Sequence, residues 1–145
     1  MILFYLSLFI ISQTSNPLII AKNLTSIFEY FQNEESISHE KIGLYSNLTI
    51  EDFESTLIFL KEKFPELQIE YMKLEKESKN RCITSANDLS IFIPADILET
   101  NSGISEYAFQ SHIKNIYGTL KVEVKIENGN TFLKGEQLFI TSIGN

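Results

Sequence analysis

A strict alternation of apolar and charged residues, followed by Asn-Gly, most restricts the fold of this 145-residue chain. Residues 120–127 read LKVEVKIE, and this two-residue period is typical of a strand with one buried face. Asn128-Gly129 is the preferred dipeptide of a type I′ hairpin turn. We expect a partner strand over residues 130–140, with a bulge at Gly135 where the apolar positions change parity. The chain is therefore expected to contain an antiparallel sheet.

A first amphipathic helix is predicted well upstream of this hairpin. Asn16 can cap it, and Pro17 can occupy its first position, where a missing N–H costs no intrahelical hydrogen bond. The apolar residues that follow recur at helical spacing and form one stripe, made of Ile20, Leu24, Ile27, Phe28 and Phe31. The helix is therefore expected to bury one face.

A second helix carries the clearest local signals. Thr49 is placed to cap it, Asp52 follows three residues later as in a capping box, and Leu48 can pack on Phe53 across the helix start. Its apolar stripe continues through Phe53, Leu57, Leu60 and Phe64. Pro65 is expected to end it.

The other segments are predicted to complete the sheet. Residues 67–74 and 82–93 are expected to form strands joined by a turn at Lys79-Asn80, and residues 106–116 a third extended stretch. An extended segment is also expected around Leu44-Tyr45. The whole pattern predicts an α+β fold, in which two N-terminal amphipathic helices pack on a curved, bulged antiparallel sheet of four or five strands.

Residues 1–15 are expected to be a secretory signal peptide. Residues 2–11 are apolar apart from Ser7, and polar residues follow directly. A membrane-spanning helix needs about 20 apolar residues, so this run has the length of a signal-peptide core. The alternative is a buried element of the fold, although the run has neither a helical nor a strand period. We therefore predict a secreted protein with a single domain over residues 16–145.

Two N-x-Thr tripeptides agree with the secretory route. They begin at Asn23 and Asn47 and match the acceptor pattern for N-glycosylation. Cys82 is the single cysteine of the chain, so no disulfide can form within it. We expect Cys82 to be a small buried side chain, with a link to another chain as the alternative.

The formal net charge of −7 limits the partners. Nucleic acids and anionic membranes are bound through clustered Lys and Arg, whereas the most basic stretch here, residues 73–81, alternates with Glu. We predict no nucleic-acid partner, and no membrane partner after leader removal. Neither His39 nor His112 has the spacing of a metal ligand, and neither a metal site nor a cofactor is predicted.

The order of these elements resembles the NTF2-like superfamily, and most of all its small secreted members in nematodes. The resemblance is carried by NPLIIAKNLTSIFEYFQ in the first helix, IGLYSNLTIEDFESTLIFL around the second and TFLKGEQLFITSI in the last strand. It implies a cone, in which helices pack on the concave face of a bent sheet around an apolar pocket. A cystatin-like fold, with one helix gripped by a four-stranded sheet, is the alternative. The inhibitory hairpin of cystatins resembles Q-x-V-x-G, and no such string occurs here.

The resemblance also implies where a ligand would bind. Some NTF2-like proteins are enzymes that use a Tyr and a carboxylate in this pocket as oxyanion donor and base. The candidate pocket tyrosines are Tyr45, Tyr71 and Tyr107, and the candidate carboxylates are Asp52, Asp88 and Asp96. None matches a family motif, so no catalytic residue is assigned.

Three functions follow as expectations. The preferred one is a secreted, non-catalytic binding domain that holds a small apolar ligand or a protein partner. The second is a pocket enzyme of isomerase or hydratase type. A carboxyl group of raised pKa beside a Tyr hydroxyl would favour it, and a pocket filled by Phe side chains would exclude it. The third is a self-associating structural protein, because sheets of this type often pair face to face in homodimers.

Overall fold

The computed structural model describes residues 2–7, 16–33, 39–74, 87–94, 103–113, 115–128 and 130–142. In chain order the elements are β1 (Ile2–Ser7), α1 (Asn16–Asn33), β2 (Lys41–Ser46), α2 (Ile50–Lys63), β3 (Gln68–Lys73), β4 (Leu89–Phe92), β5 (Gly103–Ser111), β6 (Ile116–Glu127) and β7 (Asn130–Ser142). The protein is therefore α+β, as the sequence predicts. Because both predicted helices are present, the single-helix, cystatin-like alternative does not fit.

The strands form one open, mixed sheet in the order β1-β7-β6-β5-β4-β2-β3. The pairs from β4 through β7 to β1 are antiparallel, whereas β2 runs parallel to both β3 and β4. The sequence predicts an antiparallel sheet of four or five strands. The described sheet is larger, because β1 pairs with β7 and β2 also joins it, and it is mixed because β2 is inserted between β3 and β4. These two strands therefore do not pair directly, as a hairpin would require. The turn predicted at Lys79-Asn80 lies outside the described residues.

The β6–β7 hairpin forms as predicted. Glu127 pairs with Asn130, and Asn128 has the positive φ of 54° that a type I′ turn requires. The partner register then shifts beyond Val124, which faces Leu133. The predicted bulge is therefore present, immediately before Gly135, and one residue of β7 has no partner on β6.

One strand boundary differs from the prediction. The extended stretch predicted over residues 106–116 is two strands, because β5 ends at Ser111 and Ile116 already begins β6 as its partner. Asn115 has a φ of 55°, which reverses the chain between them. Asn tolerates this left-handed conformation better than most residues do.

The caps of α2 agree with the prediction. The Thr49 hydroxyl accepts a hydrogen bond from the backbone N–H of Asp52 at 3.2 Å. Phe64 is the C-cap, directly before Pro65. Acidic residues lie in the first turn and lysines in the last, as the helix dipole favours.

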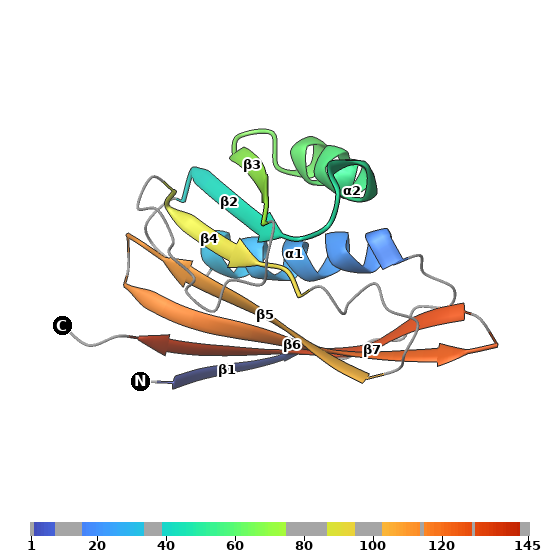
Figure 1. Ribbon diagram of the computed structural model, residues 1–145. Coiled ribbons are helices and arrows are strands. Elements are labelled where there is room, and N and C mark those ends of the chain that lie inside the picture. The colour runs from blue at the N-terminus through green and yellow to red at the C-terminus, as the bar shows by residue number, and fades with distance from the viewer. Residues whose placement is uncertain are drawn as a thin grey trace.

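The helices pack on one face of the sheet (Figure 1). The blue helix α1 lies above β5, β6 and β7, with contacts to α2, β6 and β7, while α2 packs on β3. β2, β3 and β4 stand at an angle to the long strands, in keeping with sheet twist. The core between the layers contains the predicted stripe of α1 and inward side chains of β5–β7, among them Phe28, Phe31, Phe109, Leu120 and Leu138.

β1 comes from the segment expected to be the leader. Ile2–Ser7 pairs antiparallel with residues 136–141 of β7 and forms one edge of the sheet. This pairing belongs to the uncleaved chain, so cleavage remains a prediction. Removal of residues 1–15 would make β7 the edge strand, while residues 16–142 would keep both helices and the remaining strands.

Candidate functional site

The face of the sheet that points away from α1 contains a groove of about 360 Å³. One row of cross-strand partners crosses it from β4 to β7, consisting of Phe92, Ala108, Thr119 and Phe139. The neighbouring row consists of Gln110, Tyr117 and Thr141. Because residues two apart on a strand share a face, both rows point away from the helices. The groove therefore has an aromatic floor with neutral polar groups among it.

Small residues make room for the groove and for the packing beneath it. Ala108 is the smallest side chain of its row, between Phe92 and Thr119. Gly118 lies below, and a Cβ atom there would be 2.2 Å from the ring of Phe109. The absence of a side chain at Gly118 thus lets the Phe109 ring pass under β6.

Aromatic contacts define the rim. The rings of Tyr45 and Phe92 stack with their centroids 5.0 Å apart. On the opposite side the Lys121 ammonium lies 5.1 Å from the centre of the Phe139 ring. Tyr117 is 50 % exposed and presents its ring to solvent. The rim therefore offers ring faces, and one cation already in contact with a ring.

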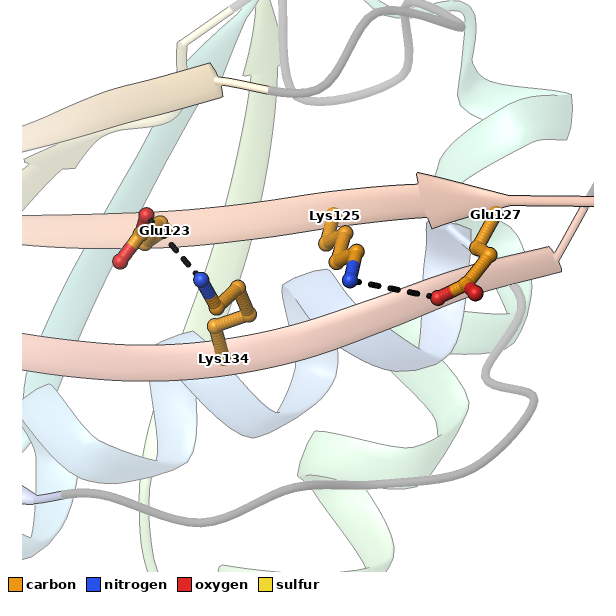
Figure 2. Close-up of polar contacts among 4 residues, drawn as sticks. All are labelled: Glu123, Lys125, Glu127 and Lys134. Carbon is orange, nitrogen blue, oxygen red and sulfur yellow. Dashed lines mark ion pairs between the residues drawn. The ribbon is translucent and has the colours of Figure 1, made fainter.

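The hairpin end of this face is charged (Figure 2). On β6, Lys125 Nζ lies 3.3 Å from Glu127 Oε2. Lys134 Nζ of β7 lies 3.7 Å from Glu123 Oε2 of β6. Figure 2 shows these side chains in front of the strands, with the helices behind. Exposed ion pairs of this kind contribute about 0–1 kcal/mol each. Their effect is to bound the aromatic groove with hydrophilic surface.

The three candidate tyrosines do not share one pocket. Tyr45 borders the groove, and its hydroxyl accepts a hydrogen bond from Asn87 Nδ2 at 2.9 Å. Tyr71 stacks on Phe53 of α2, and burial raises the pKa of its phenol. Tyr107 faces the opposite side of the sheet from the groove, beneath α1. Of the three, Tyr45 is the one that borders the groove described here, through its stacking on Phe92.

Tyr107 belongs to a buried polar cluster that the sequence did not suggest. Its hydroxyl donates to Asn23 Oδ1 at 2.8 Å, and both side chains are fully buried. Glu136 of β7 faces the same layer and is 2 % exposed. Burial raises the pKa of its carboxyl group, an effect that Ser26 and Asn23 partly oppose. The predicted bulge was the sequence signal that could have located Glu136 in the core, because the change of parity turns residue 136 inward.

A pocket enzyme needs a carboxyl group of raised pKa beside a tyrosine, and it needs that pair to be open to a substrate. This cluster meets the first requirement and does not meet the second. A carboxyl group of raised pKa lies near a tyrosine network, as general acid–base chemistry would need. Asn23 and Tyr107 are nevertheless enclosed, with Phe28, Phe31 and Phe109 in the same core. Asn23 and Tyr107 have no solvent-exposed surface, so the described structure does not present either side chain to a substrate.

The candidate carboxylates have local roles. Asp52 lies in the first turn of α2, and its charge raises the pKa of Tyr71, although burial is the larger cause. Asp88 Oδ2 accepts hydrogen bonds from the backbone N–H groups of Glu40 and Lys41, each at 2.9 Å. Both hydrogen bonds lower the pKa of the Asp88 carboxyl group, and the one from Lys41 has the larger effect. Asp96 and Cys82 lie outside the described residues.

The two histidines take part in the packing around Asp88. His39 Nε2 is 2.7 Å from Ser111 Oγ, and the ring packs edge-on against Phe31. His112 Nε2 is 3.3 Å from Ser90 Oγ, and burial lowers the pKa of this imidazole, against the opposing charge of Asp88. Together these contacts fix the start of β2 against β4 and β5.

The two predicted glycosylation sites have opposite environments. Asn47 is exposed in the loop between β2 and α2, whereas Asn23 is fully buried in α1. A glycan on Asn23 would be incompatible with its contact to Tyr107. In the folded domain only Asn47 is sterically available, and its modification remains a prediction.

Neither described helix has the length and apolar character needed to cross a membrane. Among the described side chains, no group of three or more His, Cys, Asp or Glu residues could hold a metal ion. The chain matches no family model, no curated protein and no solved structure in comparisons with known proteins.

Proposed function

We propose that the protein is a secreted, non-catalytic binding domain with an NTF2-like fold, which holds a small, neutral, largely apolar ligand in the groove on the helix-free face of the sheet. The observation that carries this proposal is the groove of about 360 Å³ between Phe92, Tyr117 and Phe139. This volume falls in the lower part of the range of small-molecule sites, about 300–1,000 Å³.

The chemistry of the lining supports a neutral ligand. None of the nine residues that line the groove is charged, so an ionic ligand would find no counter-charge within it. The aromatic rings can stack on a planar or apolar body. Gln110, Thr119 and Thr141 supply neutral hydrogen-bonding groups that can orient it.

The arrangement of the layers supports the NTF2-like part of the proposal. α1 lies along one face of the sheet while β2, β3 and β4 stand up beside it (Figure 1). Along residues 16–142 both helices precede β3 to β7, which supports the order on which the resemblance rests, although β2 lies between the two helices. The proposed ligand site lies on the outer face of the sheet, not inside the cone where the resemblance placed it.

A substitution that fills the groove tests the proposal. In Ala108→Leu the larger side chain would occupy the hollow, and we expect the affinity for N-phenylnaphthylamine, a neutral aromatic dye, to fall about tenfold or more, which corresponds to about 1.4 kcal/mol. Glu106→Leu places the same side chain on the same strand and face, outside the groove lining, and should bind the dye like the wild type. Fluorescence titration of the dye measures both.

Two outcomes would refute the proposed site. Equal dye affinity in Ala108→Leu and the wild type would show that the dye binds outside the groove. No dye binding by the wild type would show that the groove does not hold a neutral aromatic ligand. Light scattering on the same samples separates these cases from self-association. A dimer that Ala108→Leu dissociates would assign the groove to a second copy of the chain instead.

A further inference from the structure

Glu136 is an unusually enclosed acidic side chain. It is 2 % exposed, and neither of its carboxylate oxygens has a hydrogen-bond partner. Buried polar groups are normally paired, because an unpaired one loses its hydration without compensation. For an ionised carboxylate this cost is far larger than for a neutral carboxylic acid. The fold therefore favours the protonated form at this position.

The surroundings of Glu136 belong mainly to α1. Ser26 and Asn23 approach the carboxyl group from that helix without forming a hydrogen bond of ordinary geometry. The charged groups that act on it are Lys22, which is half-buried, and Glu29, which is exposed, both on α1. From the sheet, the Tyr107 hydroxyl of β5 donates a hydrogen bond to Asn23, which lies near Glu136.

Among the described side chains of the sheet, the cross-strand neighbours of Glu136 on β6 and β5 are uncharged. Val122 of β6 is its direct cross-strand partner, and Ser105 of β5 follows in the same row. Asn23 Nδ2 is itself buried without a hydrogen-bond partner. The only cation among these neighbours is thus on the helix, at the border of its buried face.

Electrostatics give the direction of the effect. Burial is the largest influence on Glu136 and raises its pKa; Ser26, Asn23 and Lys22 lower it, and Glu29 raises it further. When the pKa of a carboxyl group is higher in the folded state, its protonated form favours folding, and this contribution to the stability of the protein is complete at a pH below the ordinary glutamate pKa. That contribution is lost as the pH rises through the folded-state pKa.

We propose that Glu136 is a proton-controlled contact between β7 and α1, which allows the helix to pack on the sheet when protonated and loosens that packing when ionised. The ionised carboxylate regains hydration when α1 moves away from β7. The predicted response is thus local to α1 and stronger at high pH. It is independent of the groove, which lies on the other face of the sheet.

Hydrogen exchange on the full chain tests this proposal. Amide exchange in α1 is compared between the wild type and Glu136→Gln, which keeps the shape and removes the charge. Near about pH 4 the two proteins should exchange alike, whereas near about pH 9 the wild type should exchange faster, by about tenfold for each unit by which the folded-state pKa exceeds the ordinary value. Amides of α2 serve as the internal reference and should differ little between the two proteins.

Two further variants keep the test decisive. Glu123→Gln removes an exposed carboxylate of β6 and should leave α1 exchange unchanged. If Glu136→Gln does not fold, Glu136→Met provides an uncharged side chain of similar volume and should behave as the glutamine is expected to. Exchange in α1 that has the same pH dependence with and without the Glu136 charge overturns the proposal. So does an equal acceleration of α1 and α2, because it would show a uniform loss of stability.

Discussion

A single hydroxyl group at Tyr107 connects the sheet to α1. It donates to Asn23 Oδ1 in a fully buried environment. We expect Tyr107→Phe to lower the free energy of unfolding by about 1–3 kcal/mol, because it leaves the Asn23 oxygen buried without this donor. Urea denaturation followed by circular dichroism measures the loss.

The matched control for this prediction is Tyr117→Phe. Tyr117 is half-exposed, so water replaces any partner of its hydroxyl, and the change should be below about 0.5 kcal/mol. Similar losses in the two variants would show that the Asn23 contact contributes nothing specific.

For the candidate site, the sequence pointed to the right kind of residue, a tyrosine, but not to the residues that surround it in the fold. It singled out Tyr107 but could not supply Asn23 as its partner, because the two lie 84 residues apart. It missed Glu136 because glutamate in a strand is normally solvent-exposed. The groove was not predictable, since its rows combine residues from four strands whose pairing the sequence does not give.

The start of α2 is where local sequence and structure agree most closely. Thr49→Ala removes the hydroxyl that accepts the Asp52 N–H, and we expect a loss of about 1 kcal/mol of unfolding free energy. Thr49→Ser retains a capping oxygen and should keep most of the stability. Thermal and urea unfolding of protein from a bacterial host, without glycans, measure both variants.

Ser55→Ala is the control for the cap, because Ser55 is an exposed residue inside the same helix. It should leave stability unchanged or slightly raise it, since Ala has the higher helix propensity. If Thr49→Ala were as stable as Ser55→Ala, the cap would not matter.

The helices and the β6–β7 hairpin were predictable because their signals are local. Each depends on a period, a cap or a turn dipeptide within fewer than about 20 neighbouring residues. The sequence predicts the extended segment around Leu44-Tyr45, where β2 lies, but Ile42 to Ser46 are all buried and no alternation of apolar and polar residues distinguishes its two faces. Its parallel pairing with β3 and β4 is decided by distant segments, which a sequence pattern does not show.

At the scale of the whole molecule, the secretory route predicts one modified site. Expressed in a eukaryotic secretory host, the protein should reach the medium and lose mass on enzymatic deglycosylation. Asn47→Gln should abolish the mass shift, because Asn47 is exposed in a loop. Thr25→Val removes the other acceptor pattern and should leave the shift intact, since Asn23 is fully buried. Intact-mass spectrometry reads all three proteins, and a shift that survives in Asn47→Gln would contradict the buried placement of Asn23.

The unmatched residue in β7, Lys134, has a consequence for both faces of the molecule. In a regular ladder Gly135, Gln137 and Phe139 would face the core beside Leu133, since a slip of one position turns a strand over. The observed register instead sends Glu136, Leu138 and Ile140 inside and Phe139 outside. The enclosed acid and the aromatic wall thus share a single origin. Deleting the codon for Lys134 would leave a ladder without the extra residue, in which Gly135 still pairs with Glu123, so Glu136 would stay inside, Phe139 would stay outside and both features would survive.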